Sequence, residues 1–340
     1  MPEVITFKDA VAQGTGRKHA LLGNGFSRAC RNDIFAYGKL FERADFSKLS
    51  PSAKDAFNIL DTTDFEVVME ALKRAAKLVK LYAEEHGDLA GQFELDADGL
   101  REVLVSAIAE SHPERPGDVD AHQYQACKTF LASFDDIYSI NYDLLLYWAL
   151  MQDEIKPDVG HDDGFRQPDD GPQPWVTWDS SAHDQSVYYL HGALHIYEAG
   201  PEIQKYTWCN TQLALIDQIR AALKAEKYPL FVAEGSSEQK MSRIIRSSFL
   251  GRAYRSFENI GGSLYAYGLS MSDSDNHILR AIARNKVERL FVSVYGDPSD
   301  EANRTMIERA SHLPTERKAS GRRKNLDVVF YDAATAHVWE

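Results

Sequence analysis

Short apolar runs alternate with longer amphipathic stretches along most of the chain, and this pattern predicts strands separated by helices. Strands are predicted at residues 19–22, 137–140, 187–190, 230–232, 263–267, 289–295 and 325–331. Helices are predicted between the later strands, at residues 144–150, 211–227, 239–257, 274–285 and 300–312. Strands that alternate with helices in this way are typical of an α/β fold with a parallel sheet.

The long stretch between the first two strands has a different pattern. Its apolar residues recur at helical spacing, with lysines and glutamates on the opposite face. Helices are predicted there at residues 64–86, 99–111 and 119–134. We therefore expect residues 32–134 to form a large helical insertion within one domain that spans residues 1–340. Residues 157–184 are rich in Asp, Gly and Pro, and we expect a long irregular loop there.

Charge and cysteine content narrow the function classes. The 340 residues carry 38 Lys and Arg against 51 Asp and Glu, a net charge of −13, which argues against a protein that binds nucleic acid directly through phosphates. The three cysteines, Cys30, Cys127 and Cys209, form no C-x-x-C pair, so a structural zinc site built on paired cysteines is excluded. No apolar run reaches the ~18 residues of a membrane span, and no signal peptide is evident. We expect a cytoplasmic protein without a membrane anchor.

Glycines and polar residues follow the first two strands, where ligands bind in parallel α/β sheets. Residues 23–27 (Gly-Asn-Gly-Phe-Ser) let the backbone approach a phosphate at the start of a helix. A tight turn without a ligand is the alternative. Residues 141–143 (Asn-Tyr-Asp) place two hydrogen-bonding side chains after the second strand. The alternative is that Asn141 or Asp143 only caps the next helix.

Two later strands end in comparable motifs. His191 closes the apolar run 187–190 and precedes a glycine, which is a suitable place for a general base, although a structural histidine is the alternative. Residues 267–270 (Tyr-Gly-Leu-Ser) suit a phosphate or a ribose, and an ordinary strand-turn-helix connection is the alternative. Lys240 is interpreted as a solvated surface lysine, with a phosphate contact as the alternative.

The four motifs in this order resemble those of the sirtuin-like NAD-binding family, in particular its divergent bacterial members, some of which act in antiphage defence. The resemblance covers most of the chain and implies a Rossmann-like parallel sheet. It implies that Asn141 positions a water or the ribose beside the nicotinamide and that His191 is the catalytic histidine. The residues that the resemblance assigns to NAD binding are Gly23, Asn24, Gly25, Ser27, Asp143, Gly268 and Ser270.

Two departures from the family pattern affect the expected function. Asn24 stands where the family usually has alanine, and the zinc ribbon of deacetylating sirtuins is missing. Because that ribbon helps to shape the acyl-lysine cleft, its loss puts protein deacylation in doubt and favours water as the acceptor. We predict no bound metal.

The expected activity is hydrolysis of NAD to nicotinamide and ADP-ribose, with NAD as substrate. The bond between nicotinamide and ribose breaks through an oxocarbenium-like transition state. A neutral histidine can accept a proton, an asparagine can orient the water, and an aspartate can stabilise the developing positive charge. We expect a regulated defence effector that depletes NAD, controlled by homo-oligomerisation or by a protein partner such as a defence-associated ATPase. The alternative is a regulatory or scaffold subunit of a defence complex that binds NAD or ADP-ribose without turnover. An assembly surface formed by helix 64–86 and the helical region is a further alternative, and it is compatible with the hydrolase.

Overall fold

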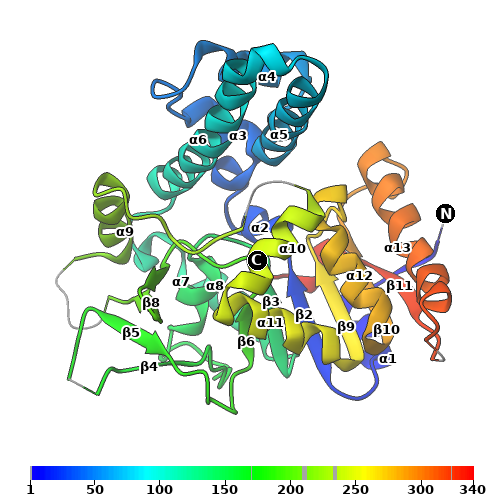
Figure 1. The fold of residues 1–340 in the computed structure, drawn as a ribbon. Coiled ribbons are helices and arrows are strands. Elements are labelled where there is room, and N and C mark those ends of the chain that lie inside the picture. The colour runs from blue at the N-terminus through cyan, green and yellow to red at the C-terminus, as the bar shows by residue number, and fades with distance from the viewer. Residues whose placement is uncertain (1, 170, 209–212, 233–235, 323) are drawn as a thin grey trace.

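A seven-stranded parallel sheet forms the centre of the molecule in the computed structural model, which describes residues 2–169, 171–208, 213–232, 236–322 and 324–340 (Figure 1). The strand order is β1-β11-β10-β9-β2-β3-β6. The strands are β1 (Val4–Ile5), β2 (Lys18–Leu22), β3 (Asp136–Ser139), β6 (Val187–Tyr189), β9 (Gly261–Tyr267), β10 (Lys286–Val294) and β11 (Asp327–Asp332). The prediction of an α/β fold with a Rossmann-like parallel sheet is confirmed.

The strand order reverses between β2 and β9. Counted along the chain from β2, the six strands β6-β3-β2-β9-β10-β11 have the 3-2-1-4-5-6 order of a Rossmann sheet. Leu22 at the end of β2 lies opposite Ser139 of β3 and Tyr267 of β9, so the three carboxyl ends are level. In such sheets the crevice outside this reversal point is where ligands bind.

Helices cover both faces of the sheet because both faces are apolar. Tyr138 of β3 contacts Phe257 on one face, whereas Tyr265 of β9 contacts Phe7 on the other. Burial of such aromatic side chains is a main source of stability in an α/β core. The covering helices are α1 (Phe7–Gln13), α7 (Ala121–Leu131), α8 (Leu145–Leu150), α10 (Ser237–Arg246), α11 (Ser248–Asn259), α12 (Asn276–Arg284) and α13 (Glu301–Ala319).

Every described element between β2 and β3 is helical. The elements before α7 are α2 (Asn24–Phe35), α3 (Tyr37–Arg43), α4 (Pro51–Ile59), α5 (Phe65–Tyr82), the short η1 (Glu84–His86), α6 (Gly87–Ser111) and the short η2 (Pro116–Asp118). Figure 1 shows α3 to α6 as a group at the top of the molecule, and we call this group the helical module. Phe41, Phe57 and Phe65 pack against one another inside it. The helix predicted from residue 99 begins at Gly87, because packing along α5 stabilises a glycine-containing stretch of low helix propensity.

The segment 157–184 is not wholly irregular, in contrast to the sequence-based expectation. It contains β4 (Phe165–Arg166) and β5 (Trp175–Trp178), which join β7 (Ile196–Ala199) and β8 (Glu202–Tyr206) in an antiparallel sheet of order β4-β5-β8-β7. Two- and four-residue strands have too little local pattern to be recognised, and β5 depends on its distant partner β8. Of the predicted strand 230–232, Phe231 forms an isolated bridge with Gly192.

Two further helix predictions differ from the structure. The predicted helix 239–257 is divided, because Ser247 is extended and its hydroxyl caps α11 by accepting the amide hydrogen of Leu250. The last helix, α13, continues past Pro314 to Ala319. Arg317 in its final turns is buried and donates to the carbonyl oxygens of Ile282 and Ala283 at the end of α12, which holds the extra turns in place.

Two observations concern the predicted cellular setting. Cys30 and Cys127 are buried free thiols, while Cys209 lies outside the described residues. In the described part of the chain, no helix combines the length and the apolar character that crossing a membrane requires.

Candidate functional site

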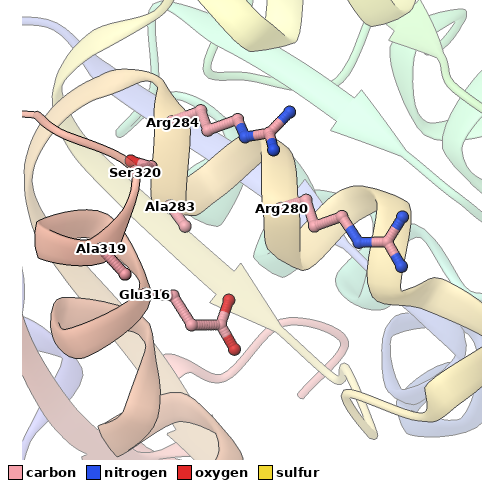
Figure 2. A pocket seen from close by; sticks show the side chains of 6 residues that line it. All are labelled: Arg280, Ala283, Arg284, Glu316, Ala319 and Ser320. Atoms are coloured by element: carbon pink, nitrogen blue, oxygen red, sulfur yellow. The ribbon is translucent and has the colours of Figure 1, made fainter.

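A cavity of about 1020 Å³ lies at the carboxyl ends of β2, β3 and β9, below the helical module. Its volume is at the upper end of the range for ligand pockets, about 300–1,000 Å³. The predicted site residues that line it are Gly23, Asn24, Gly25, Asn141, Asp143, His191, Gly268 and Ser270. A smaller hollow of about 310 Å³ lies between α12 and α13, lined by residues such as Arg284 and Glu316 (Figure 2). It contains none of the predicted site residues.

Two glycine turns touch at the reversal point of the sheet. The amide of Gly23 donates to the carbonyl oxygen of Tyr267, and the amide of Gly25 donates to that of Gly268, both at 2.9 Å. Gly268 has a φ of +69°, and a Cβ atom there would overlap the Cα atom of Gly25. The glycines thus bring the first turn of α2 against the end of β9. In this first turn the amides of Gly25 and Phe26 donate within the protein, so it is the positive end of the α2 dipole, at the cavity lining, that suits an anion.

Asn141 is held by its amide nitrogen. Nδ2 lies 3.0 Å from the carbonyl oxygen of Gly23 and 3.0 Å from Oγ of Ser27, so both of its hydrogens have acceptors. Oδ1 is consequently the atom of Asn141 that can accept a hydrogen bond from a ligand or a water. Ser27, a predicted binding residue, is buried behind the cavity wall on α2 and acts through Asn141 and Asp143.

Asp143 accepts two hydrogen bonds within the protein. Oγ of Ser27 donates to Oδ2 at 2.5 Å, and the amide of Leu145 donates to Oδ1 at 2.8 Å. The second bond satisfies an amide at the start of α8, so the alternative interpretation of Asp143 as a cap matches one of its contacts. Burial raises the pKa of the Asp143 carboxyl, and the bond from Ser27 opposes that rise.

Asn24 and Ser270 are two further predicted binding residues of the cavity. The side chain of Asn24 donates from Nδ2 to the carbonyl oxygen of Phe35, 3.2 Å away, and so joins the two ends of α2. Ser270 follows the Gly268 turn and is exposed at the cavity edge. Arg28, which the motif did not single out, also lines the cavity, and its exposed side chain places a cation on the helix that carries the first glycine turn.

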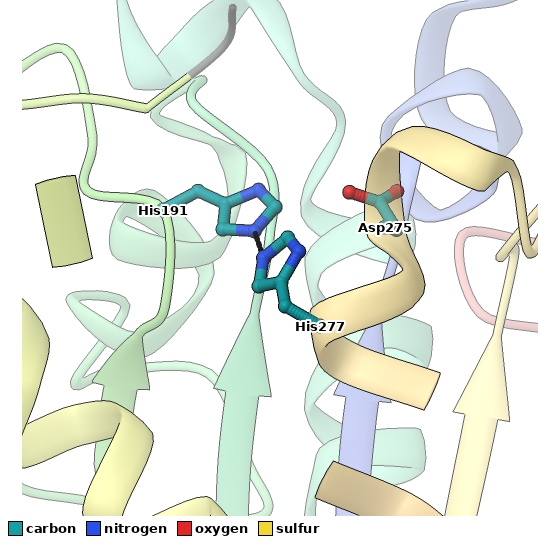
Figure 3. A group of neighbouring side chains, drawn as sticks. All are labelled: His191, Asp275 and His277. Carbon is teal, nitrogen blue, oxygen red and sulfur yellow. Dashed lines mark hydrogen bonds between the residues drawn. The ribbon is translucent and has the colours of Figure 1, made fainter. Parts of the chain in front are cut away.

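His191 is paired with a second histidine that the sequence did not indicate. Nε2 of His191 lies 2.9 Å from Nε2 of His277, and both rings are buried (Figure 3). Burial lowers the pKa of His191 well below its ordinary value and that of His277 to about 4. Both imidazoles are therefore neutral at pH 7.

The carboxylate of Asp275 lies near both rings. One ligand atom from each of His191, Asp275 and His277 falls within 4.8 Å of the other two, a donor set that suits a divalent transition metal. Nζ of Lys240, however, lies 3.2 Å from Oδ1 of Asp275 and supplies a positive charge there already. The geometry thus favours the lysine, rather than a metal ion, as the partner of this carboxylate.

Lys240 is buried, and the interpretation of it as a solvated surface lysine is wrong. Its Nζ lies 2.6 Å from Oε2 of Glu66, a residue of α5 in the helical module. Glu66 also accepts hydrogen bonds from the hydroxyls of Tyr142 and Ser274. We call Glu66, Lys240 and Asp275 the buried charge cluster, which joins the helical module to the floor of the cavity beside Asn141.

Local sequence pattern could not have found this cluster. Glu66 and Lys240 each stand on a helix where a charged residue normally faces solvent. Asp275 and His277 follow the Gly268 turn closely, and their Asp-x-His spacing at a helix start was the one available signal.

One comparison with known proteins gives a match. The family described as "Domain of unknown function (DUF4917)" matches residues 20–339. No curated protein matches the sequence. The matched segment begins inside β2 and includes both glycine turns, Asn141, the histidine pair and the buried charge cluster. The chain therefore belongs to the DUF4917 family.

Proposed function

We propose that this protein is an NAD glycohydrolase that cleaves the bond between nicotinamide and ribose. The observation that carries the proposal is the convergence of the two glycine turns, Asn141 and His191 on one cavity at the reversal point of a Rossmann-like sheet. Dinucleotides bind at this point in folds of this type. The proposal also rests on the resemblance to sirtuin-like proteins.

The residues present fit a dinucleotide. The touching glycine turns leave the backbone there uncovered by side chains, and the start of α2 offers a positive dipole end for the pyrophosphate. Arg28 adds a positive charge on the same helix. Ser270 and Gly268 provide a hydroxyl and an open backbone for a ribose.

The reaction needs one bond broken and one formed. The electron pair of the broken C–N bond stays on the nicotinamide nitrogen, and a water oxygen bonds to the ribose carbon. In our proposal Oδ1 of Asn141 accepts a hydrogen bond from that water, and neutral His191 receives the proton that the water loses. Asp143 places negative charge near the developing positive charge. The products are nicotinamide and ADP-ribose, and the proton passes from His191 to solvent.

Nicotinamide release from NAD by the purified full-length protein tests the proposal. We expect Asn141→Ala and His191→Ala each to lower kcat/KM by at least about 100-fold, the usual contribution of a positioned base or donor. Asn259→Ala and His122→Ala, at exposed positions outside the cavity lining, are the matched controls and should retain activity. Activity that survives both cavity variants would remove the assigned site.

A second candidate function is a scaffold or regulatory subunit that binds NAD or ADP-ribose without turnover. The helical module favours it, because large apolar side chains on α4 to α6 are exposed, including Leu81 (74%), Tyr82 (83%) and Leu95 (68%). Calorimetry separates the two functions, since tight NAD binding without nicotinamide release supports the second. A defence-associated ATPase or another copy of this chain would be the partner in either case.

An assembly role for the helical module predicts that substitution of its exposed leucines changes the particle mass. If copies of this chain associate through the helical module, Leu81→Glu/Leu95→Glu should reduce the particle mass measured by mass photometry, because a charged side chain is costly in an apolar interface. The exposed polar pair Lys39→Ala/Glu42→Ala on α3 is the control. An unchanged mass in the leucine variant would place the interface elsewhere.

A further inference from the structure

We propose that His277 is a positioning residue that holds His191 in the tautomer required of a general base, an inference that rests on the proposed function. His191 lines the cavity, whereas His277 is absent from its described lining. Nε2 of His191 faces His277, and Figure 3 shows the other ring nitrogen, Nδ1, turned away from it. Because Nε2 is engaged by His277, Nδ1 is the ring nitrogen of His191 that remains for a ligand or a water in the cavity.

The tautomer follows from the role of a general base, because the contact between the two Nε2 atoms allows either histidine to donate. A neutral imidazole carries one proton, so Nδ1 can accept a proton from the cavity only when Nε2 holds the ring proton. Nε2–H then needs an acceptor, because a buried donor without one is costly. Among the described residues, the acceptor at hydrogen-bond distance is Nε2 of His277, 2.9 Å away. His277 in turn carries its proton on Nδ1, 3.3 Å from Oγ of Ser237.

The surrounding charges suit a proton on His191 during the reaction. Asp275 and Lys240 face both rings, and Glu66 lies against Lys240. Asp275 raises the pKa of both imidazoles, whereas Lys240 lowers it. The carboxylate of Asp275 is therefore the group that favours the imidazolium that forms when Nδ1 of His191 accepts a proton.

Two more charged groups lie close to His277. Arg280 and Glu238 lie on the outer side, where Nη2 and Oε1 are 2.7 Å apart, so their charges largely cancel. Burial therefore has the largest effect on the pKa values of the histidine pair, and among the charged groups Asp275 and Lys240 have the largest.

Two substitutions separate positioning from simple packing. His277→Leu removes the acceptor, and we expect kcat to fall about 10- to 100-fold while KM for NAD changes little, since part of the general-base contribution is lost. His277→Gln offers Oε1 as an acceptor for the same Nε2–H, and most of the activity should return. Tyr254→Phe is the matched control, because it removes a hydrogen bond to the backbone of His277 and leaves the ring in place.

A measurement without turnover makes the test independent of the proposed function. In ¹⁵N-histidine-labelled full-length protein, NMR should find Nε2 of His191 protonated and Nδ1 unprotonated in wild type, in His277→Gln and in Tyr254→Phe. His277→Leu should lose this single state. A wild-type His191 protonated on Nδ1 would overturn the positioning role even if the protein cleaves NAD. Spectra that change when EDTA is added would also overturn it, because the pair would then hold a metal ion.

Failure of the proposed function and failure of the positioning role give different experimental results. A protein that shows the expected tautomer but cleaves no NAD contradicts the proposed function and leaves the hydrogen-bond geometry intact. If the His277→Leu variant cleaves NAD as well as the wild-type protein does, that result contradicts the positioning role alone.

Discussion

Lys240→Met is expected to lower the free energy of unfolding by about 3–5 kcal/mol, the cost of removing one partner from a buried ion pair. The side chain of Lys240 is 1% exposed and pairs with Glu66 and Asp275. Methionine has a similar shape, so little of the loss would come from packing. The two carboxylates would remain buried without a cation, and the helical module would lose its charged contact with α10.

The pKa values agree with this expectation. Burial raises the pKa of Glu66 to about 7, although Lys240 opposes the rise. The two carboxylates raise the pKa of Lys240 against the effect of its burial. In the Lys240→Met variant the pKa of Glu66 in the folded state should rise further. Above pH 7 Glu66 is ionised in the unfolded chain but resists ionisation in the folded protein, so the variant should be most destabilised there.

Urea denaturation at pH 6 and pH 8 checks the first prediction. Lys80→Met is the matched control, because Lys80 and Glu94 form an ion pair that is about half exposed on α5 and α6, and such pairs contribute about 0–1 kcal/mol. Adding Glu66→Gln to Lys240→Met should restore part of the stability, since one buried carboxylate is removed. Equal effects of Lys80→Met and Lys240→Met would contradict the account of the buried charge cluster.

Gly268→Ala is the second substitution with a large expected effect. A left-handed φ costs a non-glycine residue about 1–2 kcal/mol, and overpacking adds about 1–3 kcal/mol. Gly268 combines a φ of +69° with backbone contact to Gly25, so we expect a total loss of about 2–5 kcal/mol. The contact cannot yield by a side-chain movement, because the overlapping atoms belong to the backbone.

The control for Gly268→Ala isolates the backbone conformation. Gly296 has a φ of +77°, and a Cβ atom there would meet open space among the described residues, so Gly296→Ala should show the conformational cost alone. Thermal unfolding of both variants gives the comparison, and calorimetric titration with NAD shows whether the glycine turns also form its binding site. If the two variants lose equal stability, the contact between the two glycine turns contributes nothing to the free energy of unfolding.

The central strands and the predicted site residues could be located from sequence because their signals are local. Ala20, Leu21 and Leu22 form an apolar run that is buried on both faces, followed at once by a glycine. Since the carboxyl ends of parallel strands share one edge, the positions of the motifs after the strands were enough to predict that Asn141 and Gly268 lie at the same edge.

The features of the fold and the site that the sequence did not predict depend on contacts between distant segments. Tyr142 could be placed beside the cavity, but its hydrogen bond to Glu66 links residues that are 76 positions apart. The strand β5 is stabilised by β8, β4 by β5, and α6 by α5, rather than by their own composition. His277 and Lys240 were missed for the same reason, because no periodicity distinguishes a buried polar side chain on a helix from a solvated one.

The buried charge cluster has a consequence for the evolution of this family. Glu66 and Lys240 are 174 positions apart and belong to different parts of the fold, yet loss of Lys240 alone leaves Glu66 buried without its cation, and loss of Glu66 alone leaves Lys240 with Asp275 only. In an alignment of DUF4917 sequences, columns 66 and 240 should therefore covary. Members with an apolar residue in one column should have one in the other, and the intermediate with a single charge should be rare.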